Sequence, residues 1–236
     1  MDNMLKTEQR KPELLNFKHP FQLYGITTDK RQLRVPTWRL VTQRIMADGA
    51  KEDDVRVIHI SIKLARISYL KNEYSTAKLG YEWCLQKLEN LAGENNEDIV
   101  KLIAMAEDWY GRLLVDLENS EKGLNLMISS LNRMQKTNVE QEHVIVQMND
   151  IGTVCDRLGK YDEGIKYLLK AIELGKQMSA MDELGTMYVN LGRIYMKQNL
   201  LEMARKSCGQ GWKLGVTTKN DNLKHEAELC FKELKL

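Results

Sequence analysis

Large and small side chains recur along the chain in one fixed order, which predicts a repeated pair of helices. At four places a large residue stands directly before a small one. Counted from that small residue, position 12 is again small, position 16 is large in most copies, and position 19 is small. Small residues at matching positions of two helices let the backbones approach closely, and bulky residues fill the space between neighbouring pairs. The copies are Leu64-Ala65 with Ala77, Tyr81 and Cys84; Tyr110-Gly111 with Gly123, Met127 and Ser130; Ile151-Gly152 with Gly164, Leu168 and Ala171; and Leu191-Gly192 with Ala204, Cys208 and Gly211.

These copies follow the pattern of the tetratricopeptide repeat, a helix hairpin that stacks into a solenoid. Successive copies begin 46, 41 and 40 residues apart, whereas this repeat has about 34 residues. The surplus falls between hairpins, for example at 93–96, so we expect a longer second helix or a longer loop. Within hairpins we expect turns at 71–73 and 158–160, where Gly159 suits the left-handed backbone that ends a helix. The expected fold class is all-α, a right-handed α-solenoid of tetratricopeptide-type helix hairpins with a C-terminal capping helix.

Proline and helical periodicity divide the chain into two parts. All 3 prolines lie before residue 37, and proline breaks helix interiors. We therefore expect an irregular leader at 1–36 and a tetratricopeptide-repeat domain at 37–236. Within the domain we expect a half hairpin at 37–47, hairpins at about 55–91, 98–136, 141–178 and 182–216, and a capping helix at 220–235.

The overall charge excludes some classes of partner. The chain has 35 basic and 33 acidic residues, a net charge of +2. A dedicated nucleic-acid binder would carry a basic surplus, and a protein attached to a membrane surface by electrostatics would carry a polybasic segment. The sequence also has no run of eighteen apolar residues that would span a membrane as a helix. These observations leave other proteins as the expected partners.

The residues that commonly carry chemistry are scattered. The four histidines do not have the spacing of a helical zinc site, and the sequence has no phosphate-binding loop, nucleophile elbow or dinucleotide fingerprint. The four cysteines, Cys84, Cys155, Cys208 and Cys230, lack the close pairing of a zinc or redox motif, so we expect four buried thiols in a reducing compartment. Trp83 and Trp109 could stack on a nucleotide, but packing within hairpins is the commoner role. We expect no enzymatic activity, no cofactor, no metal and no small-molecule substrate.

A concave groove lined by the first helix of each hairpin is the expected binding surface. With the large residue of each opening pair counted as position 7, positions 2, 5, 6 and 9 are expected to face the groove. These positions hold His59, Ile62, Lys63, Arg66, Met105, Asp108, Trp109, Arg112, Val146, Asn149, Asp150, Thr153, Thr186, Val189, Asn190 and Arg193.

Two chemistries in this set suit a protein ligand. Asn149 and Asn190 offer both a donor and an acceptor to the backbone of an extended segment. The basic residues Lys63, Arg66, Arg112 and Arg193 favour an acidic or carboxylate-bearing segment. Together with Trp109 these six residues form the candidate partner-binding set. The alternative is that they are solvated groove residues without a ligand.

Several segments resemble the mitochondrial tetratricopeptide repeat protein 19 family. They are Ile60–Ala65, Gly80–Cys84, Leu158–Glu163 and the terminal helix from His225 to Leu234. The long spacing between copies also fits that family, and the resemblance covers roughly residues 34–236.

The resemblance implies a protein of the mitochondrial inner membrane that is not an enzyme. Members of that family support the biogenesis of respiratory complex III. They are thought to bind the assembled complex and to help clear fragments of its Rieske iron–sulfur subunit. The family has a transit peptide, a membrane anchor and earlier repeats ahead of the matching region. In this chain Asp2, Glu8 and Glu13 depart from an acid-free presequence.

Two other classes of function fit the same repeats. One is a cytosolic adaptor similar to the kinesin light chain repeats, whose spacing is also long. The other is a structural scaffold within a larger assembly.

Overall fold

The computed structural model describes residues 43–91, 96–179 and 181–234, and this part of the chain is helical without any strand. The expected all-α fold class is confirmed. The predicted leader and residues 37–42 of the predicted half hairpin lie outside the described residues, whereas residues 43–47 are helical. The helices that follow are α2 (Val55–Leu70), α3 (Tyr74–Leu91), α4 (Glu97–Asp116), α5 (Ser120–Met134), α6 (Gln141–Arg157), α7 (Tyr161–Gly175), α8 (Leu184–Lys197), α9 (Leu201–Thr217) and α10 (Asp221–Glu233).

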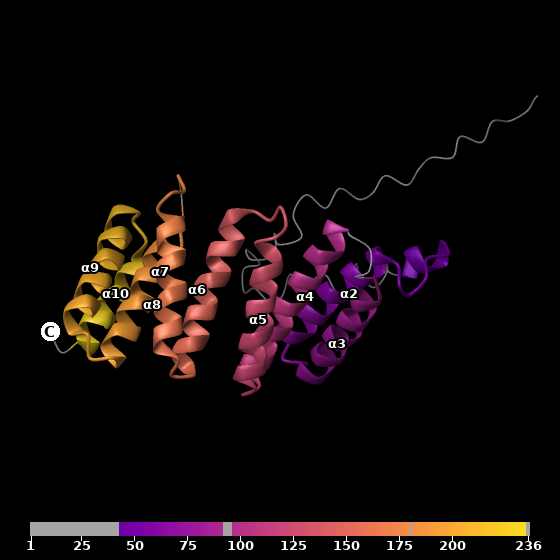
Figure 1. The fold of residues 1–236 in the computed structure, drawn as a ribbon, viewed down its shortest axis with the longest axis horizontal. Coiled ribbons are helices and arrows are strands. Elements are labelled where there is room, and N and C mark those ends of the chain that lie inside the picture. The colour runs from indigo at the N-terminus through magenta and orange to yellow at the C-terminus, as the bar shows by residue number, and fades with distance from the viewer. Residues whose placement is uncertain (1–42, 92–95, 180, 235–236) are drawn as a thin grey trace, which may run out of the picture.

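The helices form antiparallel hairpins that stack in chain order (Figure 1). The hairpins are α2/α3, α4/α5, α6/α7 and α8/α9, and the second helix of each contacts the first helix of the next. Helix α10 lies against both α9 and α8 and so occupies the place of a further first helix. Each hairpin therefore contacts mainly its neighbours, as in other solenoids.

Small residues bring the two helices of a hairpin into backbone contact. A Cβ atom placed on Gly123 would lie 2.6 Å from the carbonyl oxygen of Gly111, and one placed on Gly111 would lie 2.8 Å from that of Gly123. In the next hairpin, a Cβ on Gly164 would lie 3.0 Å from the oxygen of Gly152. Real Cβ atoms essentially never lie as close as the first two distances, and the third is tighter than nearly all real Cβ contacts. The helix spacing therefore favours small residues at these positions of the repeat pattern.

The turns inside the hairpins share one backbone conformation. Each has three residues, and the middle residue has a positive φ: 64° at Asn72, 60° at Glu118, 72° at Gly159 and 59° at Asn199. The N–H of the following residue donates to a carbonyl five positions back, as Asn119 does to Leu114 at 2.9 Å. This is the Schellman arrangement, which satisfies carbonyls at the end of a helix.

We expect Glu118→Gly to stabilise the chain. A left-handed backbone costs a residue with a Cβ about 1–2 kcal/mol, and glycine avoids that cost but loses more entropy on folding, so the net gain is about 0.5–1 kcal/mol. Urea denaturation measures the difference. The matched control is Gly159→Ala, which introduces the same strain where a Cβ would meet no atom within 4 Å, and it should destabilise by a similar amount. Equal stability of both variants and the parent would contradict the left-handed turns.

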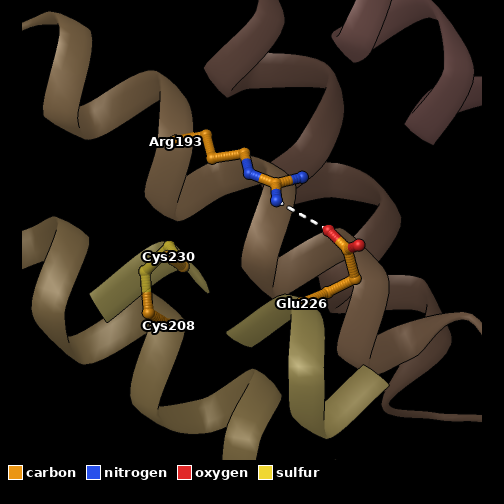
Figure 2. The surroundings of a disulfide bond; sticks show 4 residues. All are labelled: Arg193, Cys208, Glu226 and Cys230. Atoms are coloured by element: carbon orange, nitrogen blue, oxygen red, sulfur yellow. Dashed lines mark hydrogen bonds and ion pairs between the residues drawn. A yellow bond between two sulfur atoms is a disulfide. The ribbon is translucent and has the colours of Figure 1, made fainter. Parts of the chain in front are cut away.

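The cysteines correct one expectation from the sequence. Cys208 and Cys230 form a disulfide that joins α9 to α10 (Figure 2), so the expectation of four thiols is wrong for these two residues. Cys84 and Cys155 are free and buried, and burial raises the pKa of these thiols to about 12 and about 11. The two bonded residues lie 22 positions apart on separate helices, a spacing that matches no short motif.

Candidate functional site: the first-helix face

The first helices present one stripe of polar side chains to the same side of the stack, which we call the first-helix face. On α6 the exposed or half-buried members are Val146, Asp150, Thr153 and Arg157, and on α8 they are Thr186, Asn190, Arg193 and Lys197. These are positions 2, 6, 9 and 13 of each copy. The face has the chemistry of a protein-binding surface, with hydrogen-bonding groups and both signs of charge.

Position 5 does not belong to this face, which corrects part of the sequence prediction. Ile62, Asp108, Asn149 and Val189 are all at most 7% exposed. His59 and Met105, at position 2 of the first two copies, are buried as well. The register of the repeat is right, but each first helix is rotated so that position 5 faces the neighbouring helices.

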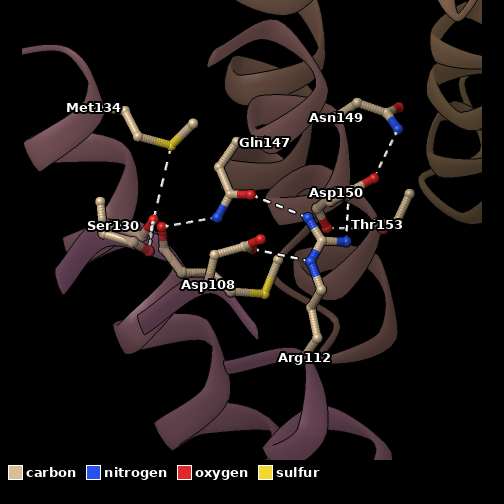
Figure 3. Close-up of polar contacts among 10 residues, drawn as sticks. Asp108, Arg112, Ser130, Met134, Gln147, Asn149, Asp150 and Thr153 are labelled. Atoms are coloured by element: carbon tan, nitrogen blue, oxygen red, sulfur yellow. Dashed lines mark hydrogen bonds and ion pairs between the residues drawn. The ribbon is translucent and has the colours of Figure 1, made fainter. Parts of the chain in front are cut away.

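Arg112 is the centre of the best-connected group on this face (Figure 3). Its guanidinium donates to Asp108 at 2.9 Å, to Asp150 at 2.5 Å and to Gln147 at 3.0 Å. Asp108 lies on the same helix, whereas the other two partners lie on α6. The planar guanidinium suits such a site because it donates in several fixed directions. Arg112 thus joins the second and third hairpins.

Other members of the candidate set make equivalent links between hairpins. The Arg66 guanidinium lies over the rings of Tyr69 at 4.8 Å and Trp109 at 5.7 Å, which connects α2 to α4 by cation–π contact. The Asn190 amide donates to the Asn149 oxygen at 3.0 Å, which connects α8 to α6.

The last link is an ion pair between Arg193 of α8 and Glu226 of α10, at 2.7 Å. Every first helix is therefore connected to the next by a residue of the candidate set. We call these contacts the polar row: Arg66–Trp109, Arg112–Asp150, Asn149–Asn190 and Arg193–Glu226. The row aligns the hairpins, and binding of a partner by these residues stays a prediction.

Lys63 lies apart from the polar row. It is buried, and this burial lowers the pKa of its ammonium group. His59 stands one turn earlier on α2, and burial, with a smaller contribution from Lys63, lowers its pKa to about 4. His59 is therefore neutral at pH 7.

The sequence analysis missed a second line of contacts, at the far end of the first helices. The Tyr69 hydroxyl bonds to Asp116, Arg157 lies 4.0 Å from Asp116, and Lys197 donates to Asp156 at 2.6 Å. The repeat spacing contains the signal, because Asp116, Arg157 and Lys197 stand 41 and 40 residues apart, as the copies do.

Carboxylates of this face pair with cations or with the Tyr69 hydroxyl, and these contacts join helices of different hairpins. Within residues 43–91, 96–179 and 181–234, no group of three or more His, Cys, Asp or Glu side chains is placed to hold a metal ion. No helix in the same ranges is both long enough and apolar enough to cross a bilayer. The first-helix face presents hydrogen-bond donors, acceptors and charged groups in a row along the first helices of the hairpins.

Comparison with known proteins identifies the repeat. A sequence profile for the tetratricopeptide repeat matches residues 148–176 and 185–211. The mitochondrial tetratricopeptide repeat protein 19 homolog of Drosophila melanogaster is 29% identical over 198 residues, which cover 83% of this chain and 54% of the relative. Mitochondrial tetratricopeptide repeat protein 19 of Homo sapiens is 26% identical over 190 residues, with 75% and 50% covered. The chain resembles the tetratricopeptide repeat protein 19 family and carries the tetratricopeptide repeat.

These matches confirm the resemblance to the tetratricopeptide repeat protein 19 family that was inferred from the sequence. The relatives are named mitochondrial, and this chain spans about half the length of the curated relatives it matches. The repeat fold and the family together point to a non-catalytic scaffold that binds proteins.

Solved structures confirm the solenoid. BtubC (BKLC) from P. vanneervenii superposes with a TM-score of 0.69 at 16% identity, with 84% of this chain and 77% of that chain covered. A putative kinesin light chain repeat protein from Podospora anserina superposes with a TM-score of 0.66 at 12% identity, with 86% and 97% covered. At these identities the likeness concerns the fold alone.

Proposed function

We propose that the chain is a non-catalytic scaffold that supports the biogenesis and maintenance of mitochondrial respiratory complex III. The observation that carries the proposal is the match to the tetratricopeptide repeat protein 19 relatives along most of the described helices, in a fold that presents a long binding face. In this proposal the chain works at the mitochondrial inner membrane, where it binds the complex and aids clearance of Rieske subunit fragments.

The first-helix face is the proposed contact with the complex. A solenoid binds through many weak contacts spread over several hairpins, which suits a large folded assembly better than a small molecule. The half-buried side chains Asp150, Thr153 and Asn190, with exposed Thr186, supply the polar part of such an interface.

Co-purification of the imported chain tests this function. Given a working mitochondrial presequence, the tagged chain should retain complex III, and depletion of the native protein should lower complex III activity and leave Rieske fragments. If activity persists after depletion while motor or vesicle proteins co-purify, the chain is an adaptor similar to the kinesin light chain repeats.

A substitution on each side of the stack locates the contact. Thr186→Arg places a long side chain on the first-helix face without removing any member of the polar row, and it should reduce co-purified complex III at least tenfold. The matched control is Asn125→Arg, which adds the same charge at an exposed position of α5, a second helix. Equal retention by the two variants would move the interface away from the first-helix face.

A further inference from the structure

The last second helix, α9, exposes positions that earlier second helices bury. Leu131 of α5 and Ile172 of α7 occupy the same repeat position and are 3% and 4% exposed, whereas Trp212 of α9 is 40% exposed. On the same stripe, Val216 lies one turn after Trp212 and Leu201 about three turns before it, and they are 46% and 51% exposed. A stripe of exposed apolar side chains is costly unless another surface covers it.

Helix α10 is the described element that follows α9 in the stack. Helix α10 occupies the position of the next first helix, and no described residue occupies the position of the next second helix. The contacts that hold α10 in place include the Cys208–Cys230 disulfide and the Arg193–Glu226 ion pair (Figure 2). The exposed stripe of α9 therefore lies beside a helix, α10, whose position is fixed by these contacts.

Helices α9 and α10 pack against each other beside this stripe. A Cβ on Gly209, which lies on the same stripe as Trp212, would meet only the tip of the half-buried Phe231 ring, at 3.9 Å. We call Leu201, Arg205, Trp212, Val216 and Phe231 the end face.

The charges of the end face select the partner. At the position of Arg205, α5 has Leu124, which is 1% exposed, and α7 has the half-buried Ile165. Arg205 is exposed, and so are its neighbours Lys206 and Lys213. None of these three forms an ion pair with a described residue, and their charge exceeds that of Glu202, the acidic residue of α9. A helix carrying carboxylates beside an apolar stripe would match both features.

We propose that the end face binds an acidic amphipathic helix of a partner protein. Its apolar stripe packs on Trp212, Leu201 and Val216, and its carboxylates pair with Arg205, Lys206 and Lys213. In the earlier hairpins Leu131 and Ile172 are buried in the core, on helices that contact the first helix of the following hairpin. This inference rests on the proposed function as a protein-binding scaffold and assigns to it a second surface, distinct from the first-helix face.

A labelled synthetic helix tests the proposal with the purified full chain. The probe is an amphipathic helical peptide with leucine along one face and glutamate along the other, and its control has the same composition in scrambled order. Fluorescence anisotropy should show binding of the probe and at least tenfold weaker binding of the scrambled peptide. Trp212→Glu and Arg205→Glu should each weaken probe binding at least tenfold. Lys170→Glu, which makes the same charge change as Arg205→Glu at an exposed position of α7, should leave probe binding unchanged. Circular dichroism checks that all variants are folded.

Three results would overturn the proposal. Equal probe binding by Trp212→Glu and the parent places the peptide elsewhere. Self-association of the parent that Trp212→Glu abolishes makes a second copy the occupant. Binding to vesicles containing phosphatidylserine, without binding to the probe, makes the end face a membrane contact. Each is distinct from failure of the proposed function, because the peptide assay contains no complex III.

Discussion

Gly123→Ala is expected to lower the free energy of unfolding by about 3 kcal/mol, at the upper end of the usual cost of overpacking. The new Cβ would lie 2.6 Å from the Gly111 carbonyl oxygen and 3.0 Å from the Val115 amide nitrogen. Both are backbone atoms of α4, so relief requires the two helices to separate. Urea denaturation followed by circular dichroism measures the loss.

Two other glycines provide controls for this expectation. At Gly152 the new Cβ meets mainly the Leu168 side chain, at 2.7 Å, which can shift more easily, so alanine should cost about 1 kcal/mol there. At Gly209 the nearest atom is 3.9 Å away, and alanine should stabilise the helix by up to about 1 kcal/mol. If the three variants were equally stable, the close approach of α4 and α5 would be wrong.

Arg112→Ala is expected to destabilise the chain by about 3 kcal/mol, because breaking a buried ion pair leaves charge without its partner. The Arg112 side chain is 22% exposed, and its partner Asp108 is 1% exposed. The substitution also removes the bonds to Asp150 and Gln147 that join α4 to α6. Thermal unfolding should show the loss as a lower melting temperature.

Arg157→Ala is the matched control for the polar row. Its side chain is 65% exposed and lies 4.0 Å from Asp116, so the change should cost less than about 1 kcal/mol. Arg112→Lys should retain only part of the stability, because an ammonium group does not reproduce the fixed geometry of the guanidinium. A fully stable Arg112→Ala variant would mean that the polar row does not hold the hairpins together.

The fold was predictable because its signal is local and repeated. The spacing from Gly111 to Gly123 and from Gly152 to Gly164 recurs at 12 residues, and the structure shows why, since those residues are where two backbones touch. Gly159 likewise predicted a left-handed turn, because glycine favours a positive φ. Glu118 has the same backbone conformation at the equivalent position, but a glutamate does not predict it.

The candidate site was less predictable because its contacts join helices about 40 residues apart. Arg112 has a basic side chain suited to a ligand carboxylate, and only the packed structure shows that Asp150 already supplies one. Asn149 was assigned to the groove from its position in the repeat, but the rotation of α6 buries it against the Asn190 amide. The Cys208–Cys230 bond likewise depends on how α10 lies on α9.

The polar row links consecutive hairpins along one side of the solenoid, and these links affect how the solenoid can bend and twist. Each hairpin touches only its neighbours, so a twist applied at one end is divided among the successive junctions, and each junction adjusts a little. Four links join consecutive first helices: Arg66 to Trp109, Arg112 to Asp150, Asn190 to Asn149 and Arg193 to Glu226. They limit how far the first helices can spread while leaving small changes of pitch available. A partner on the first-helix face would therefore contact a surface of nearly fixed curvature. That surface could still adjust to small conformational changes of a large assembly.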